Sequence, residues 1–387
     1  MTIVFLALLI LTLIALQNYV YRRFWDRGLN IDIKFSAKEA FEGDRLYLTE
    51  ELTNNKLLPL PWLYLSFRMS NNLEFTDSLV SSEAEAIGGT NQNKPTINTP
   101  YNEPSQNQNE LFSVMMFQSI NRRLSLVCKK RGVYRFERAS LAASNLLHTK
   151  QFTKDVKAVN QLVVFPKLID TPEFDVIYKR MDASILSNQL INPDPFEFRG
   201  IREYQPTDPA HTVNFKATAI AQQLMVNIHA PISSKRLNII LNLEPYSAYP
   251  DHELYEEALR MAATIARHYV NENVSVAFTT NGRDIDTREE ISLRVGSSTA
   301  HLYNIFETLA RIDLILDVTP MAKHINNITD YETVYLIISP NHQDDLLESF
   351  KRLQSRGGTG FLIIPVFTGT ILDYKDTGHI SVWEVDS

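Results

Sequence analysis

The sequence predicts an α+β multidomain chain, with an apolar N-terminal helix, a β-sandwich-like domain and then a doubly wound α/β domain. Residues 3–16 are almost wholly apolar, residues 31–166 mostly alternate apolar and polar side chains, and after residue 171 apolar runs alternate with stretches of helical spacing. A length of 387 residues is also long for one hydrophobic core. Two or three domains are therefore expected.

The first element is a transmembrane anchor, predicted over residues 1–21. Its segment IVFLALLILTLIAL contains no charge, and with the residues up to 21 it makes a helix of about 19 residues and roughly 28 Å, enough to cross the hydrocarbon core of a bilayer. A cleaved signal peptide is the alternative, but it calls for basic residues before the apolar run and small residues after it. Aromatic and basic residues follow the run instead: Tyr19, Tyr21, Arg22, Arg23, Trp25 and Arg27. This favours a retained single-pass anchor in the inner or plasma membrane, with the soluble part in the cytoplasm.

Residues 31–167 are predicted to form the β-sandwich-like domain. IDIKFSAKEAFEGDRLYLTEELTNN alternates apolar and polar side chains, with residues 42–44 as a turn, and LPLPWLYLSFRM and NQLVVFPKL are further strands. A hairpin is expected about residues 130–132. Residues 81–110 are rich in Asn, Gln, Ser and Pro and nearly lack large apolar side chains, so we expect a flexible insertion there.

Residues 168–235 are predicted to be a connecting segment, and residues 236–387 the α/β domain. RLNIILNLE, VSVAFTTNG, TVYLIISP and GFLIIPV are short apolar runs typical of buried strands. Helical patterns lie between them, over residues 251–270, 299–312 and 342–358. Buried strands joined by helices predict a parallel sheet that is covered on both faces.

Composition and motifs exclude several functions. A net charge of -7 and a pI near 5.8 argue against a nucleic-acid partner. The one cysteine, Cys128, excludes an internal disulfide and a cysteine metal cluster, and it is expected to be a buried structural residue. HExxH and GxSxG motifs are absent from the sequence, and the glycines at 357–360 lack the Lys-Ser/Thr of a phosphate-binding loop.

The carboxyl ends of the parallel strands are the expected place for a site in the α/β domain. The first end carries Asn242, Glu244, Tyr246 and Ser247, the second carries residues 279–281, and a later one carries Ser339 and Asn341. Oxygen ligands of this kind could hold Mg²⁺. Helix capping and turn formation are the favoured interpretation, because Glu244 is the single carboxylate of the first end. No cofactor is therefore expected.

The densest polar stretch is FEFRGIREYQPTDPAHTVNFKATA, residues 196–219. Three interpretations compete for it. In a catalytic loop, Glu203 or Asp208 acts as acid or base while Arg199 and Arg202 hold an anion. In a partner-binding loop, the arginines and Tyr204 are exposed. In a structural latch, which we favour, Arg202, Glu203 and Lys216 pair internally while Tyr204, Phe215 and Leu224 pack.

This stretch resembles the hallmark of the bacterial family known as domain of unknown function 58. The positions that match the hallmark are Arg202, Tyr204, Asp208, Lys216, Ala219 and Leu224. The segments FEGDRLYLTEELTNNKLLPLPWL, KKRGVYRFERASLAASNLL and LVVFPKL also resemble the family, so the similarity covers nearly the whole chain beyond the anchor. Thr207, Pro209, His211 and Phe215 depart from the hallmark. A packing motif tolerates such changes better than a catalytic one.

The resemblance implies a membrane-anchored protein with a β-rich part and a von Willebrand factor A-like α/β part. It also implies association with MoxR-type AAA+ ATPases. The metal-adhesion motif of that fold falls on Asn242, Glu244 and Tyr246, which are poor matches for it, so no metal is expected. We therefore expect a non-enzymatic interaction or assembly protein that acts beside such an ATPase in maturing envelope complexes. The alternatives are a hydrolase that uses Glu203 and Asp208, and an envelope-facing binding module.

Overall fold

The computed structural model describes residues 2–76, 105–191, 193–206, 208–231, 236–247, 251–370 and 379–386. The chain divides into two compact units, Met1–Lys167 and Leu168–Ser387. Residues 81–104 of the expected flexible insertion lie outside the described residues. The remainder of that prediction is wrong, because residues 105–110 begin a ten-residue strand, β6 (Ser105–Val114).

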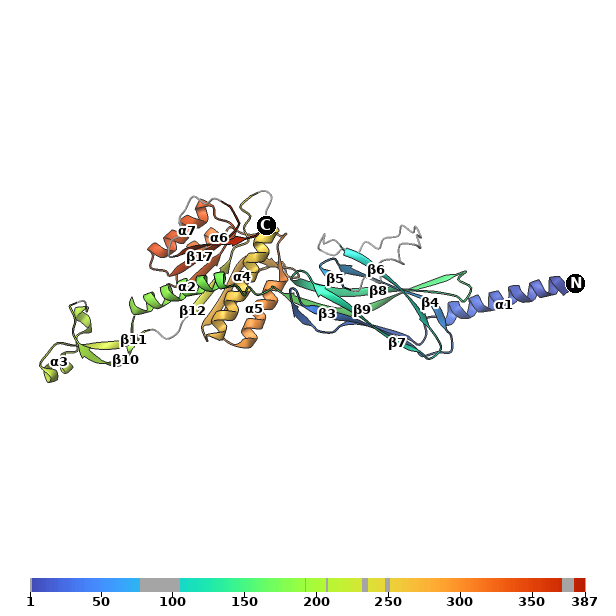
Figure 1. Ribbon diagram of the computed structural model, residues 1–387, viewed down its shortest axis with the longest axis horizontal. Coiled ribbons are helices and arrows are strands. Elements are labelled where there is room, and N and C mark those ends of the chain that lie inside the picture. The colour runs from blue at the N-terminus through green and yellow to red at the C-terminus, as the bar shows by residue number, and fades with distance from the viewer. Residues whose placement is uncertain are drawn as a thin grey trace. The chain divides into compact units, whose positions relative to one another are not determined.

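Helix α1 (Thr2–Phe24) opens the N-terminal unit (Figure 1). Over Ile3–Phe24 it is long and apolar enough to cross a membrane, and most of its large apolar side chains are exposed. Its last turn and the residue that follows it are different. Tyr21 and Trp25 are only 1% and 6% exposed, and both belong to the core of the β strands that follow. The Tyr21 hydroxyl donates to the Pro59 carbonyl at 2.8 Å, so the helix continues into the unit without a flexible joint.

The rest of this unit is a sandwich of two sheets. The first has the order β1-β3-β7-β5 and the second the order β2-β9-β8-β4-β6. Strand pairs are antiparallel except β2 with β9. The strand bounds are β1 Leu29–Phe35, β2 Glu39–Phe41, β3 Arg45–Asn54, β4 Leu60–Ser70, β5 Leu73–Phe75, β7 Ser119–Cys128, β8 Gly132–Ser144 and β9 Gln151–Phe165. The β-sandwich-like domain is therefore confirmed.

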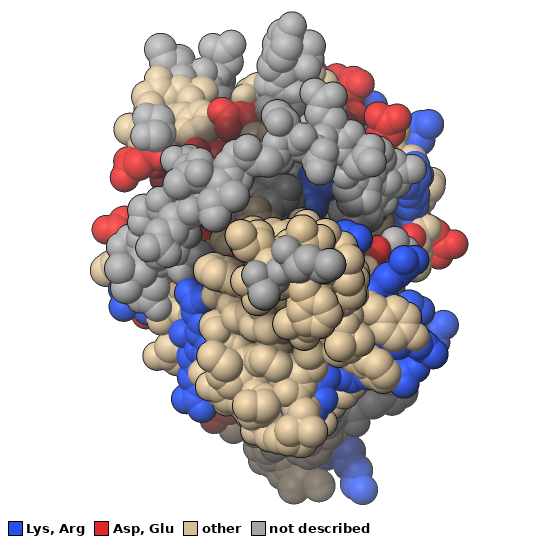
Figure 2. Space-filling model, turned by 90° about the vertical axis from the view of Figure 1, so that its right-hand side faces the viewer, with Lys and Arg blue, Asp and Glu red and all other residues tan. Residues whose placement is uncertain are grey.

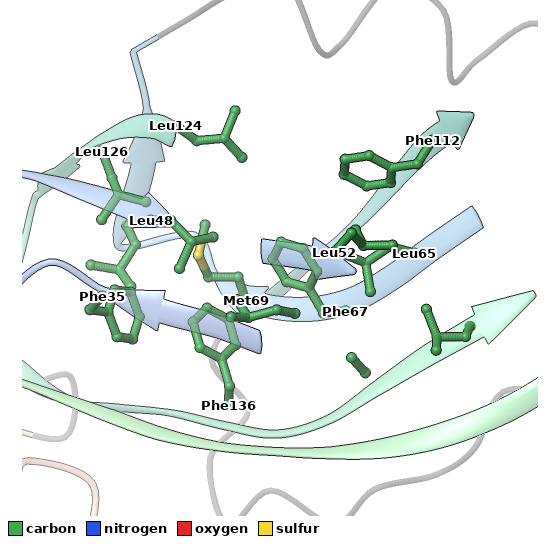
Figure 3. Close-up of a cluster of buried hydrophobic side chains, with 14 of the residues drawn as sticks. Phe35, Leu48, Leu52, Leu65, Phe67, Met69, Phe112, Leu124, Leu126 and Phe136 are labelled. Atoms are coloured by element: carbon green, nitrogen blue, oxygen red, sulfur yellow. The ribbon is translucent and has the colours of Figure 1, made fainter. Parts of the chain in front are cut away.

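Period-two alternation places one face of each sheet in a shared core. From residue 63 onward in β4, the buried side chains are Leu63, Leu65, Phe67 and Met69, every second residue. Figure 3 shows Leu65, Phe67 and Met69 converging with Leu48 and Leu52 of β3, in the other sheet, and with Phe136 of β8. Cys128 is buried in this core, and burial raises the pKa of its thiol to about 11. The prediction that it is a structural residue is consistent with this environment.

The hairpin predicted about residues 130–132 is wrong. β7 pairs with β3 and β5, whereas β8 pairs with β4 and β9. The turn therefore carries the chain from one sheet to the other. The turn at residues 42–44 is confirmed, and it too joins strands of different sheets, since β2 pairs with β9 and β3 with β7.

A charged cluster lies inside the sandwich. Glu50 on β3 is fully buried, and Glu110 on β6, in the other sheet, is nearly so. Arg122, directly across from Glu50 in the β3–β7 ladder, donates to the Glu110 carboxylate at 2.7 Å. Burial is the main cause that raises the pKa of Glu50, to about 9, and the nearby Glu110 carboxyl adds to it. Glu50 is therefore protonated at neutral pH.

The C-terminal unit is built on a sheet of order β14-β13-β12-β16-β17-β18, with β15 beside β13. β12, β13, β16, β17 and β18 run parallel, and β14 and β15 are antiparallel to β13. The strand bounds are β12 Arg236–Leu241, β13 Ser275–Asp284, β14 Glu290–Gly296, β15 Ile312–Asp313, β16 Val334–Ile338, β17 Gly360–Phe367 and β18 Ile380–Val385. Apart from β15, this is the 3-2-1-4-5-6 order of a doubly wound sheet.

Helices cover this sheet: α4 (His252–Asn271), α5 (Thr299–Arg311), α6 (Met321–Asn326) and α7 (Asp344–Ser355). α6 and α7 pack together on β16 and β17. Helix α2 (Pro172–Ile191), which the sequence analysis placed in a connecting segment, packs within the same unit. Its Phe174 ring meets Trp383 of β18, and its Tyr178 ring stacks on His268 of α4. The α/β unit therefore begins near residue 168.

Candidate functional site

The polar stretch predicted from the sequence forms a small module of its own, which we call the hairpin module. Strand β10 (Pro193–Glu203) pairs antiparallel with β11 (Met225–Pro231). The connection between them holds a 3₁₀ turn (Ala210–Thr212) and the short helix α3 (Phe215–Ala221). Figure 1 shows the two strands joined through α3.

Side-chain caps fix this connection. The Asn214 side chain caps α3 by accepting from Ala217 N at 2.9 Å, and it donates to Asn227 of β11 at 2.7 Å. The Thr218 hydroxyl accepts from Met225 N at 3.0 Å. Gln222 ends the helix in the left-handed conformation, with φ 54. Local capping therefore gives the module a defined shape.

The charged residues of the module bind one another. Arg202 and Asp208 form a two-pronged ion pair in which both guanidinium–carboxylate distances are 2.6 Å. Gln205 N donates to the same carboxylate at 2.8 Å. The Arg202 hydrogen bonds are the main cause that lowers the pKa of Asp208 below its ordinary value. Glu203 accepts from the Gln223 amide at 2.8 Å.

These contacts can be compared with each of the three interpretations. Both carboxylates proposed for catalysis accept hydrogen bonds from within the module, and Asp208 is held in its ionised form. The internal pairing expected of a latch is present for Arg202, but its predicted packing is wrong: Phe215 is 80% exposed and Leu224 is also exposed. His211 and Lys216 are exposed and Tyr204 is half-buried, while the side chain of Arg199 lies outside the described residues.

Sequence reasoning missed the apolar surface of the module. Ile220 is 78% exposed, and Phe198, Ile201 and Ile228 are also exposed. Apolar residues in strand and helix patterns are ordinarily assigned to a core, so no signal in the sequence marks them as surface residues. A concentration of exposed apolar side chains on one small element is typical of a surface that binds another molecule.

The carboxyl ends of β12, β13 and β16 meet as predicted. Asn242, Asn281 and Ser339 are fully buried there. The Asn242 amide donates to Ser339 Oγ at 2.9 Å, and its Oδ1 accepts from the Asn281 amide at 2.9 Å. The Asn281 Oδ1 accepts a hydrogen bond from Leu243 N, and the Asn281 amide also donates to the Thr319 carbonyl. Buried amides and hydroxyls thus satisfy one another at this edge.

Glu244 and Tyr246 also have structural contacts. The Glu244 carboxylate accepts from Met321 N at 3.1 Å, at the start of helix α6, where negative charge interacts favourably with the helix dipole. The backbone carbonyl of Tyr246 accepts from the Gln343 side-chain amide at 3.1 Å. The Tyr246 ring lies near the ring of His342. Among the described residues no group of three His, Cys, Asp or Glu side chains could hold a metal ion. These contacts fit the capping interpretation.

We expect Asn242→Asp to lower the stability of the α/β unit by about 1–3 kcal/mol, because it removes the donor to Ser339 and places a carboxylate in a buried amide network. Thermal unfolding, with and without millimolar Mg²⁺, checks this. Asn238→Asp, half-buried on the same strand, is the matched control. A wild-type melting temperature that rises with Mg²⁺ would contradict the capping interpretation.

The fold is thus that of a mixed α+β protein, with an N-terminal helix able to span a membrane, a β-sandwich and an α/β unit. No family model matches the chain, and no curated protein matches it. Among solved structures it is similar to the CARDB domain of a Pyrococcus furiosus protein in complex with di-metal ions, at 8% identity and a TM-score of 0.20, over 36% of this chain and 90% of that one.

Two cohesins are similar at the same level. One belongs to a type I cohesin–dockerin complex of Clostridium thermocellum, with 12% identity and a TM-score of 0.21 over 35% of this chain and 99% of that one. The other is a non-cellulosomal cohesin of the archaeon Archaeoglobus fulgidus, with 11% identity and a TM-score of 0.20 over 38% of this chain and 96% of that one. Similarity this low carries no argument about function.

Proposed function

We propose that this chain is a membrane-anchored, cytoplasm-facing interaction or assembly protein that works beside a MoxR-type AAA+ ATPase in chaperone-like maturation of envelope complexes. The observation that carries the proposal is the hairpin module. Arg202 pairs with Asp208 and Glu203 accepts from Gln223 within the module, while several large apolar side chains face solvent. A module of defined shape with an exposed apolar surface suits protein binding better than chemistry.

The end of α1 supports a retained anchor. Signal-peptide cleavage near residue 21 would separate Tyr21 from the core to which its side chain belongs. Arg22, Arg23 and Arg27 follow the apolar run, which favours a cytoplasmic location for everything after it.

We further propose that the α/β unit is von Willebrand factor A-like. Its doubly wound strand order and the sequence resemblance at the hairpin module support this. In this proposal the edge at Asn242 and Glu244 is a structural remnant that works without metal, because its polar groups bind one another and the start of α6. In this proposal the hairpin module, and not this edge, binds the partner.

The double substitution Phe215→Ser and Ile220→Ser is expected to weaken binding of the ATPase by about 30-fold, since two exposed apolar anchors contribute roughly 2 kcal/mol. The measurement is the Kd of a purified MoxR-type AAA+ ATPase from the same organism for the full chain in lipid nanodiscs. Ile315→Ser, which alters an exposed isoleucine elsewhere in the unit, is the control.

An unchanged Kd in the double variant would show that the hairpin module is not the binding surface. The proposed partner would be overturned if the wild-type chain did not bind the ATPase and if pull-downs from native membranes did not recover the ATPase with the chain. Pull-downs with an Arg202→Ala bait test whether the shape of the module matters, since this change breaks the ion pair with Asp208.

A further inference from the structure

Four chain connections gather at one end of the sandwich, around the end of α1. The strand registers place there the α1–β1, β3–β4, β6–β7 and β8–β9 connections. The Asn54 side chain joins two of them by donating to the carbonyls of Leu58 at 3.0 Å and Met115 at 2.8 Å. The Tyr21 hydroxyl binds the β3–β4 connection at Pro59, and Lys56 donates to the carbonyls of Trp25 and Arg27.

The tips of these connections carry large exposed apolar side chains. Leu57 is 72% exposed and Phe117 is 66% exposed. We call the set the apolar collar; its members are Leu57, Met115, Met116, Phe117, Leu146 and Leu147, all exposed. Phe117 has a φ of 51, a left-handed conformation that is rare for a bulky residue. So many apolar side chains at one end of a unit indicate a binding surface.

Basic residues accompany the collar. In the same connections and at the end of α1 lie Arg22, Arg23, Arg27, Lys56 and Lys150, and Lys154 lies near the start of β9. Asp26 is the acidic residue among them, and it is paired with Lys154 at 2.9 Å. Figure 2, which looks toward the N-terminal end with α1 pointing at the viewer, shows an uncharged central area, to which α1 contributes, flanked by lysine and arginine. Such a border attracts anionic lipid head groups.

The position of the collar along α1 identifies what covers it. The Asn145 side chain donates to Asn18 Oδ1 at 2.5 Å, so the β8–β9 connection reaches helix residue 18. The apolar span Ile3–Phe24 has 22 residues, about 33 Å of helix, which is close to the thickness of a hydrocarbon core, so residue 18 lies within the span and not beyond it. If the bilayer reaches residue 24, the collar lies at its surface layer.

We infer that the apolar collar inserts into the interfacial layer of the bilayer that α1 crosses, with the basic residues on anionic head groups. The sandwich is then held against the membrane by α1 and by three loop tips together. Apolar side chains of this kind bury about 5–10 Å into the boundary between head groups and acyl chains. The inference requires α1 to lie in a bilayer and is independent of any protein partner.

The test places an environment-sensitive fluorophore on single cysteines in the full chain, at Leu57→Cys, Phe117→Cys and Leu147→Cys. Cys128 does not compete, because it is buried. In nanodiscs that contain anionic phosphatidylglycerol, doxyl-labelled lipid is expected to quench each loop label about two-fold, as for groups at interfacial depth. Lys130→Cys, in the exposed β7–β8 turn at the opposite end, is the control and is expected to show no quenching.

Leu9→Cys, in the middle of α1, separates the possible failures. Quenching at Leu9 without quenching at the three loops would overturn the inference while leaving the anchor intact. If the loop labels were quenched equally in purely zwitterionic nanodiscs and in nanodiscs with anionic phosphatidylglycerol, the proposed role of the basic residues would be overturned. The melting temperature of each labelled chain confirms that it is folded.

Discussion

Trp25→Ala is expected to lower the free energy of unfolding of the N-terminal unit by about 3–5 kcal/mol, the range for removing a buried tryptophan from a core. Trp25 follows α1 directly, is buried, and lies in the core of the sandwich, where its ring stacks near Phe152 at 6.5 Å between centroids. Hydrogen exchange of the β3 and β4 amides, measured on the full chain in nanodiscs, reports on this unit.

Phe24→Ala is the matched control, because Phe24 precedes Trp25 and is exposed. It is expected to leave the β3 and β4 amides protected. Equal loss of protection in both variants would mean that the helix end, and not the buried indole, stabilises the sandwich. No loss in Trp25→Ala would refute the continuity between α1 and the core.

Glu50→Gln is expected to remove most of the pH dependence of stability of the N-terminal unit. The pKa of Glu50 is raised from its ordinary 4.5 to about 9, so folding takes up a proton between these values. The free energy of unfolding of the wild type therefore falls as pH rises from about 4.5 to about 9, by up to about 1.4 kcal/mol per pH unit. Glutamine resembles the protonated carboxyl and cannot ionise.

The measurement is denaturant unfolding at several pH values between 5 and 9. Glu50→Gln is expected to be more stable than the wild type at pH 8 and about equal to it at pH 5. Glu51→Gln, the exposed neighbour on the same strand, is the control and should follow the wild type. A wild-type profile that rises across this range would contradict a protonated Glu50.

Local sequence pattern predicted the elements of the fold well, because alternation and helical spacing report directly on burial. The same pattern could not predict how strands pair. The Lys130-Arg131-Gly132 turn has the composition of a hairpin turn, yet its two strands lie in different sheets. A turn signal is local, whereas the choice of partner strand depends on packing against residues far along the chain.

Burial failed as a prediction where context outweighs residue type. The alternation places Glu50 on the inner face of β3, between Leu48 and Leu52, but residue type gives no sign that a carboxyl is buried there together with Glu110 and Arg122. Phe215 was expected in a core and is exposed. Residues 105–110 look too polar to order, yet β6 pairs with β4 through its backbone, a role that polar residues can fill.

For a chain anchored as proposed, the burial of Tyr21 and Trp25 also limits how the protein can leave the membrane. A protease that cut the chain at the surface of the bilayer would leave part of the sandwich's own core behind in the lipid. The released fragment would be damaged and prone to degradation, so shedding cannot produce an intact soluble form. The amount of folded protein is thereby tied to the amount that is inserted.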